Sequence, residues 1–187
     1  MKIAVIDNYD SFVYNLVRYL DEIEGVEVSV FRNNHIDYSF LDSSDGILLS
    51  PGPGIPENAG DLLNVLEKYH SSKKILGVCL GHQAIGTFFG AELIQNSNPI
   101  HGKSSEIVTD NETTIFNDLP RKINVGRYHS WSVSKKLSPS LAATARAMDG
   151  EIMAIEHINL PIIGVQFHPE SILTPHGRKM ISNWINS

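Results

Sequence analysis

Cysteine is nearly absent from this chain: among its 187 residues, only Cys79 carries a thiol. A single cysteine cannot form an intramolecular disulfide, and it excludes the zinc sites that are built from several cysteines. Basic residues are also few, with 15 Lys and Arg against 21 Asp and Glu and a net charge of −6. Because phosphate binding needs clustered Lys and Arg, this balance argues against nucleic acid as the main partner.

Long hydrophobic runs are absent as well. No apolar stretch approaches the roughly 20 residues that a transmembrane helix needs, and the apolar opening at residues 2–6 is too short for a secretion signal. No repeat, low-complexity tract or long linker divides the chain. With 42% hydrophobic and 19% charged residues the composition is typical of a folded protein. We therefore expect one domain over residues 1–187, in a cytoplasmic protein without a membrane partner.

The chain does contain an alternation of strand-like and helix-like segments. Short apolar runs predict strands at 2–6, 26–31, 46–50, 74–78 and 161–167. Helical periodicity predicts helices at 11–20, 59–69 and 82–89, and a closing helix that begins with Thr174 as N-cap and Pro175 in its first turn. The less regular segment 91–147 predicts antiparallel strands added at the sheet edge. The expected fold is α/β: three layers, with a mainly parallel twisted sheet, helices on both faces and a small antiparallel sheet.

Cys79 stands at the carboxyl end of one predicted strand, just before a helix and between Gly77 and Gly81. Ligands of such sheets bind beyond the carboxyl ends of the strands, and the positive end of a helix favours the thiolate form of a cysteine. The pattern G-x-C-x-G parallels the G-x-S-x-G nucleophile elbow of hydrolases, in which the next N–H, here that of Leu80, points at an oxyanion. The alternative for a lone cysteine is a small buried hydrophobic residue.

A nucleophilic cysteine needs a base, and His168 is the best placed of the eight histidines. It ends an apolar strand and precedes Pro169, which favours an extended conformation before it. With a period of two, His168 and Glu170 project to one side, so that the carboxylate can hold the ring. His82 is closer to Cys79 in sequence, but we expect it to point elsewhere from its helix. H-x-E also occurs in zinc deaminases, whose cysteine pair is missing here, so no metal is expected.

The segment 50–60 predicts a rigid turn at the same end of the sheet. Pro51 and Pro53 have no N–H, so that Gly52 and Gly54 provide the backbone donors of this turn. Two preorganised donors aimed at one point suit an oxyanion, although a Pro-Gly stretch alone is more often only a turn.

Six motifs resemble those of class I (triad) glutamine amidotransferases, and in particular the small subunits (component II) of anthranilate synthase and aminodeoxychorismate synthase. They are DNYDSF (7–12), SPGPG (50–54), GVCLGHQ (77–83), HGK (101–103), RYHSW (127–131) and GVQFHPES (164–171). The resemblance implies hydrolysis of L-glutamine to glutamate and ammonia through Cys79, His168 and Glu170, by way of a glutamyl thioester. It also implies an oxyanion hole formed by the N–H groups of Gly52 and Leu80.

The resemblance further implies two sets of contact residues. The expected glutamine-binding residues are Gly52, Pro53, Gly54, Gln83, Ser130 and Trp131, the last replacing a leucine of many relatives. The expected contacts to a partner are Tyr9, Asp10, Ser11, His101, Gly102 and Lys103. This partner is a chorismate-using synthase large subunit (component I), which receives the ammonia and carries Mg²⁺, while no cofactor is expected in this chain. The alternative for Gln83 is a helix-surface amide, and for Trp131 a core aromatic residue. For Tyr9, Asp10 and Ser11 the alternative is an N-cap box before the first helix, and for residues 101–103 a polar turn.

No residue decides which partner is served. We favour anthranilate synthase, in tryptophan biosynthesis, because that assignment is commoner; aminodeoxychorismate synthase, in p-aminobenzoate and folate biosynthesis, or service to both, is the alternative. A stand-alone glutaminase or γ-glutamyl peptidase would use the same scaffold. A flavodoxin-like redox-sensing or chaperone protein is the alternative from a different class, and HPES at the end of a buried strand disfavours it.

Overall fold

A computed structural model describes residues 1–110 and 112–187, apart from the side chains of residues 97 and 98. Its strands are β1 (Lys2–Asp7), β2 (Glu27–Arg32), β3 (Gly46–Leu49), β4 (Lys74–Val78), β5 (Leu93–Thr109), β6 (Lys122–Val133), β7 (Leu141–Ala147), β8 (Ile152–His157) and β9 (Ile162–Val165). Its helices are α1 (Val13–Asp21), α2 (Tyr38–Ser43), α3 (Leu62–Tyr69), α4 (Leu80–Phe88) and α5 (Gly177–Ile185), with short 3₁₀ turns η1 (Pro56–Asn58) and η2 (Thr114–Phe116).

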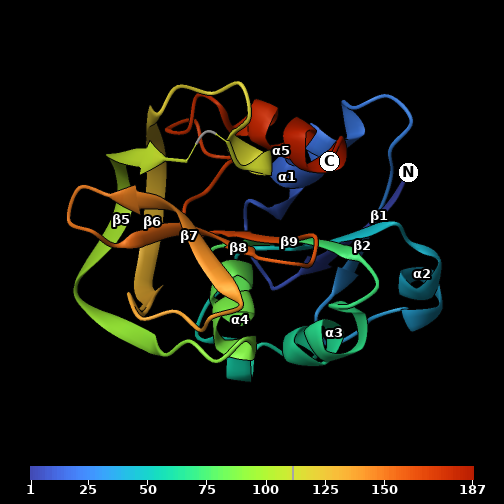
Figure 1. Cartoon of the computed structure of the whole chain (residues 1–187). Helices are drawn as coiled ribbons and strands as arrows, with labels where there is room; N and C mark the ends of the chain where they lie inside the picture. The colour runs from blue at the N-terminus through green and yellow to red at the C-terminus, as the bar shows by residue number, and fades with distance from the viewer. Residues whose placement is uncertain (111) are drawn as a thin grey trace.

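The strands form one sheet in the order β2-β1-β3-β4-β9-β8-β7-β5-β6 (Figure 1). The five strands from β2 to β9 pair in parallel, whereas β8, β7, β5 and β6 pair antiparallel. This arrangement confirms the predicted α/β fold and the antiparallel addition at the sheet edge. The added strands are longer than the short extended pieces that the sequence indicated, and β5 covers 17 residues with two irregularities in its pairing with β6.

The period of two along the buried strands produces the two outer layers. In β1, Ile3 and Val5 belong to a core cluster with α1 and α5, whereas Ala4 and Ile6 belong to a second cluster with α3 and α4. All four side chains are fully buried. Consecutive apolar residues are therefore explained by helices on both faces, α1 and α5 above the sheet and α2, α3 and α4 below it in Figure 1.

The closing helix begins later than the sequence predicts. Helix α5 starts at Gly177 with His176 as its N-cap, so Thr174 does not cap it and Pro175 precedes it. The Thr174 hydroxyl instead accepts a hydrogen bond from the N–H of Gly126 and donates one to the carbonyl of His168. A tertiary connection thus replaces the local capping role that the sequence pattern indicated.

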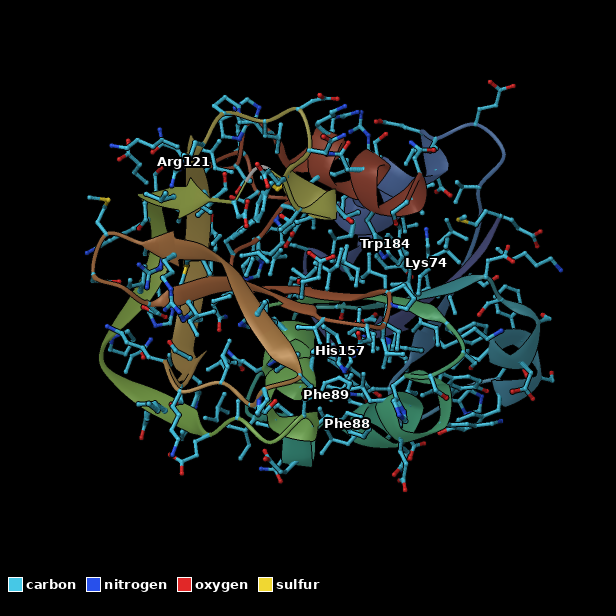
Figure 2. The ribbon with its side chains drawn as sticks, viewed as in Figure 1. Lys74, Phe88, Phe89, Arg121, His157 and Trp184 are labelled. Carbon is cyan, nitrogen blue, oxygen red and sulfur yellow. The ribbon has the colours of Figure 1, made fainter. Side chains whose placement is uncertain are left out.

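Side chains from distant elements tie the layers together (Figure 2). Lys74 Nζ, at the start of β4, donates to the carbonyl oxygens of Trp184 and Ile185 at 2.9 and 3.1 Å, and so satisfies the carboxyl end of α5. On the opposite face the rings of Phe89 and His157 lie 4.7 Å apart between centroids. None of the helices within residues 1–110 and 112–187 is long and apolar enough to cross a membrane.

Candidate active site

Cys79 occupies a strained position between β4 and α4. Its φ of 50° and ψ of −97° lie in the left-handed half of backbone space, which residues with a Cβ rarely adopt. The residue is the N-cap of α4, which begins at Leu80, two residues earlier than the sequence predicts, and its N–H donates to the carbonyl of Val165 at 2.8 Å. Strain of this kind is typical of functional sites, where the surrounding fold enforces it.

Close backbone packing holds this turn in place. A Cβ added to Gly81 would lie 2.3 Å from the carbonyl oxygen of Leu49, and one added to Gly77 would lie 2.5 Å from the carbonyl of Gly81. Only glycine at both positions lets the first turn of α4 lie against β3 and β4. The pair of glycines around the cysteine is therefore a geometric requirement of the elbow.

His168 and Glu170 form the pair that the period of two predicts. His168 Nδ1 lies 2.6 Å from Glu170 Oε1, and both residues are about 5% exposed. The His168 N–H donates to the carbonyl of Gly126 at 3.0 Å, which anchors the segment after β9 to β6. The other ring nitrogen, Nε2, has no hydrogen-bond partner within the described residues. The ring is thus held by one nitrogen and has the other free for proton transfer.

The pKa of His168 is raised well above its usual value. Burial alone would lower this pKa, but Cys79 and then Glu170 favour the protonated ring more strongly. The neighbouring Cys79 and Glu170 side chains thus favour the proton-carrying form of the imidazole.

The three residues meet in one cavity of about 630 Å³. Cys79, His168 and Glu170 line it together with Gly52 of the Pro-Gly turn, and Asp10, Phe12, Tyr128 and Ile172 are among the other lining residues. Cys79 is 6% exposed, so the residue is almost entirely buried at the wall of this cavity. Residues from the ends of β1, β3, β4 and β9 converge there, as expected of a parallel sheet.

The N–H groups of Gly52 and Leu80 are the expected donors to the oxyanion. Leu80 is the first residue of α4, and its N–H has no helical carbonyl to bond to. Gly52 lines the cavity, but Pro53 and Gly54 are exposed and do not line it. Gly54 has a φ of 78° and serves the turn itself.

The amide of Gln83 is buried rather than on a helix surface, since only 3% of the residue is exposed. Its Nε2 donates to the carbonyl of Trp131 at 2.9 Å and to Oε1 of Gln166 at 3.2 Å. Gln83 is therefore joined to the backbone of the 130–131 segment. The Trp131 side chain is half-buried and lines a separate shallow groove with Ile55 and Leu93, away from the Cys79 cavity.

The residues expected at a partner interface divide into two groups. Tyr9, Ser11 and the strand segment 101–103 are exposed. Asp10 instead lines the cavity, and burial raises the pKa of its carboxyl group, with nearby Glu170 and Asp7 adding to the effect. Gly102 lies next to Tyr128, another lining residue, because a Cβ at Gly102 would contact the Tyr128 ring at 3.4 Å.

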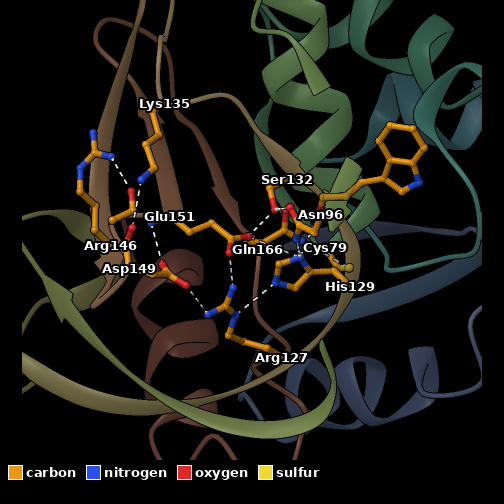
Figure 3. Close-up of polar contacts among 12 residues, drawn as sticks. Cys79, Asn96, Arg127, His129, Ser132, Lys135, Arg146, Asp149, Glu151 and Gln166 are labelled. Carbon is orange, nitrogen blue, oxygen red and sulfur yellow. Dashed lines mark hydrogen bonds and ion pairs between the residues drawn. The ribbon is translucent and has the colours of Figure 1, made fainter. Parts of the chain in front are cut away.

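A buried polar network that local sequence reasoning missed lies beside the cavity (Figure 3). Arg127 pairs with Glu151, donates to His129 Nε2 at 3.3 Å and is 2% exposed. His129 Nδ1 lies 3.0 Å from the carbonyl oxygen of Trp131. Burial, with the charges of Arg127 and His168, lowers the pKa of His129 to about 4, although Glu151 opposes the shift. No acidic residue is close to His129 in sequence, so only tertiary structure reveals this pairing.

Gln166 and Tyr128 are two further residues of the site that the sequence did not predict. The Gln166 amide contacts Cys79, and the Tyr128 ring lies against the ring of His168 with centroids 5.0 Å apart. A signal existed for Gln166, since it precedes His168 by two residues and so projects to the same side of an extended chain.

Comparisons with known proteins agree with this geometry. The family model described as glutamine amidotransferase class-I matches residues 4–187. Anthranilate synthase component 2 of Mycobacterium tuberculosis is 46% identical over 99% of this chain and 82% of its own length. The aminodeoxychorismate/anthranilate synthase component 2 of Bacillus subtilis is 45% identical over 99% of this chain and 96% of its own.

A solved structure extends the agreement to the fold. A Thermoplasma acidophilum protein, provisionally described as part of GMP synthase, has a TM-score of 0.88 and 31% identity, with 100% of this chain and 92% of that chain covered. A strained cysteine elbow and a paired histidine in one cavity thus occur in a chain that matches the family over nearly its full length. The chain belongs to the class I glutamine amidotransferases.

Proposed function

We propose that this chain is the glutaminase subunit of a chorismate-using synthase, with anthranilate synthase as the favoured assembly. The observation that carries the proposal is the pair His168–Glu170, joined at 2.6 Å, both of which line the same cavity as Cys79. We propose further that residues 1–187 act as one amidotransferase domain with no cofactor of its own, and that Mg²⁺ belongs to the partner.

The geometry suits acyl transfer through the sulfur. The Cys79 thiolate attacks the side-chain amide carbon of glutamine, and the N–H groups of Gly52 and Leu80 hold the resulting oxyanion. The protonated His168 then gives its proton to the departing nitrogen, so that ammonia leaves and a glutamyl thioester remains. His168 next takes a proton from water, which attacks the thioester and releases glutamate. Glu170 holds the ring in position through both halves of the reaction.

The rim of the cavity offers a docking surface for the synthase partner. Phe12 and Ile172 line the cavity and are 54% and 94% exposed. Exposed apolar residues gathered at one place mark interaction sites. A synthase partner seated there would cover the mouth and receive ammonia directly.

The choice of synthase rests on the relatives. The M. tuberculosis and Haemophilus influenzae relatives, at 46% and 40% identity, bear the anthranilate synthase name, the latter as a provisional assignment. The B. subtilis relative bears both names. Aminodeoxychorismate synthase, or service to both enzymes, is therefore the second candidate.

Replacement of the nucleophile tests the proposal. In a complex with the synthase partner, Cys79→Ser should lower glutamine-dependent product formation by at least about 10³-fold, because no thiolate remains to attack the amide. Synthesis from added ammonium salts should persist, since the partner's site is untouched. A glutamine-analogue electrophile should label the wild-type chain once, and glutamine should block the labelling.

The same assay identifies the partner. The chain is mixed with each candidate synthase large subunit, and the aromatic product is analysed by mass. Anthranilate supports the favoured assignment and aminodeoxychorismate the second. Oxidation of Cys79 by peroxide, without labelling by the glutamine analogue, would instead indicate a redox sensor and refute the proposal.

A further inference from the structure

Gln166 joins the nucleophile to the proposed glutamine-binding amide. Its side chain is fully buried, and its Nε2 lies 3.6 Å from Cys79 Sγ as a hydrogen-bond donor. Its Oε1 accepts a hydrogen bond from Gln83 Nε2 at 3.2 Å. Figure 3 shows Gln166 within the polar network beside Cys79. One amide therefore has the sulfur on one side and Gln83 on the other.

The hydrogen-bond partners determine which way this amide points. Gln83 Nε2 also donates to the carbonyl of Trp131 at 2.9 Å, so the nitrogen end of Gln83 is oriented by a backbone acceptor. Gln166 must consequently present its oxygen to Gln83, because the reversed amide would set two NH₂ groups against each other. Its own NH₂ group is then directed at the sulfur.

The backbone holds this donor firmly in position. The Gln166 N–H donates to the carbonyl of Met153 in β8 at 2.9 Å, and the Cys79 N–H donates to the carbonyl of Val165, one residue earlier in the chain. The amide and the thiol are thus carried by neighbouring strands whose register is set by hydrogen bonds. Such a donor needs no rearrangement when charge develops on the sulfur.

We propose that Gln166 is a catalytic residue that donates a hydrogen bond to the Cys79 thiolate. Through its second hydrogen bond, to Gln83, it also fixes the position of the sulfur relative to Gln83. The proposal rests on the glutaminase function proposed above. A buried N–H directed at an anion stabilises it more than the same group in water, because no solvent competes. His168 and the amino end of α4 supply positive charge, and Gln166 supplies a neutral donor to the sulfur while it is a thiolate, before the attack and again when water releases glutamate.

The variant Gln166→Glu removes the hydrogen-bond donor while it keeps the packing of the side chain. The new side chain has the same shape and still offers an oxygen to Gln83, but it presents a carboxylate oxygen to the sulfur. Loss of a hydrogen bond to a charged group corresponds to about 10- to 100-fold in rate, and we expect kcat for glutamine hydrolysis to fall by this factor. Gln166→Met, which removes both contacts, should lower kcat and also raise KM.

A pH profile provides the readout that a merely structural role would not change. Because Cys79 is the only thiol, the rate of alkylation by iodoacetamide reports on this residue alone. The pH of half-maximal alkylation should rise by about one unit in both variants, as expected when a hydrogen bond to a charged group is lost. Thr87→Val is the matched control, because among the described residues the Thr87 hydroxyl bonds only to carbonyls of its own helix at 3.0 and 3.2 Å. Its alkylation profile should match the wild type.

An unchanged alkylation midpoint in Gln166→Glu, with only a lower melting temperature, would overturn the proposal. If both variants fail to fold, the wild-type protein still decides the matter by NMR: the Gln166 side-chain amide protons should shift with the alkylation midpoint, and this shift should vanish in Cys79→Ser. Amide signals that ignore the thiol would refute the contact. Because alkylation needs no glutamine, a wild type that fails to hydrolyse glutamine would refute the proposed function while leaving this test intact.

Discussion

At the scale of single residues, the charge on His168 depends on what faces each of its ring nitrogens. Glu170 Oε1 accepts from Nδ1 at 2.6 Å, while Nε2 remains free of partners in the described chain. The raised pKa of His168 results from Cys79 and Glu170 acting against burial. Two residues that are adjacent to His168 in space thus decide whether it can donate a proton to the leaving group.

Glu170→Gln should weaken this arrangement without removing the hydrogen-bond acceptor. The neutral amide no longer favours the protonated ring, so the pKa of His168 should fall, and kcat/KM for glutamine should drop about 10- to 100-fold. The measurement is the pH profile of glutamine hydrolysis in the synthase complex. Glu156→Gln, a half-buried carboxylate of β8 whose pKa is raised by burial, is the matched control and should retain activity. Equal profiles for the wild type and Glu170→Gln would contradict the role of this carboxylate.

At the scale of elements, the placement of α4 determines where the Cys79 elbow and the Leu80 N–H point. The helix lies so close to β3 that a Cβ on Gly81 would overlap the Leu49 carbonyl at 2.3 Å. Real Cβ atoms do not approach backbone so closely, hence helix or strand must move when one is added.

Gly81→Ala should therefore displace the first turn of α4. We expect the free energy of unfolding to fall by about 1–3 kcal/mol, as for other overpacked cores, and glutamine hydrolysis to be lost even in the folded fraction. Gly90→Ala is the comparison, since its φ of 89° imposes backbone strain while no atom of the described residues lies within 4 Å of the added methyl group. It should cost about 1–2 kcal/mol and retain activity. Urea unfolding and hydrolysis assays on both variants check this, and a fully active Gly81→Ala would show that the close approach is not required.

At the scale of the whole molecule, acid should weaken the fold through histidines that are buried in the neutral form. His82 is fully buried on α4, and burial lowers its pKa to about 3; the charge of nearby His129 acts in the same direction. In the unfolded chain the same group takes up a proton near pH ~6.5. Between these values the unfolded state binds more protons, so the stabilising contribution is complete above about pH 6.5 and is lost as the pH falls toward about 3.

The pH dependence of stability tests this assignment. Urea unfolding of the wild type should show a lower free energy of unfolding at about pH 5 than at about pH 7, with His82 contributing about 2 kcal/mol to the difference. His82→Asn should reduce the difference by about that amount, whatever its effect on stability at neutral pH. An identical difference in the two proteins would mean that His82 takes up its proton in the folded state over the same pH range as in the unfolded chain.

The sequence predicts those parts of the site that depend on residues close together in the chain. His168 and Glu170 were paired correctly because a period of two acts over two residues, and Cys79 was placed correctly because a strand, a glycine and a helix follow one another in the chain. The predicted N-cap at Thr174 was wrong, since Gly126 and His168 use its hydroxyl. Local rules fail where a distant partner competes for the same group.

The amino-acid sequence by itself determined the buried strands, the cysteine elbow, the histidine–carboxylate pair and the family resemblance, because each depends on neighbours within a few residues. Tertiary structure alone decided that Asp10 lines the cavity, that Arg127 and Glu151 surround His129, and that Gln166 touches the sulfur. These contacts depend on strand order, which places β9 beside β4 although Cys79 and Gln166 are 87 positions apart in the chain. Strand order is set by the packing of whole layers, and no short pattern in the chain encodes it.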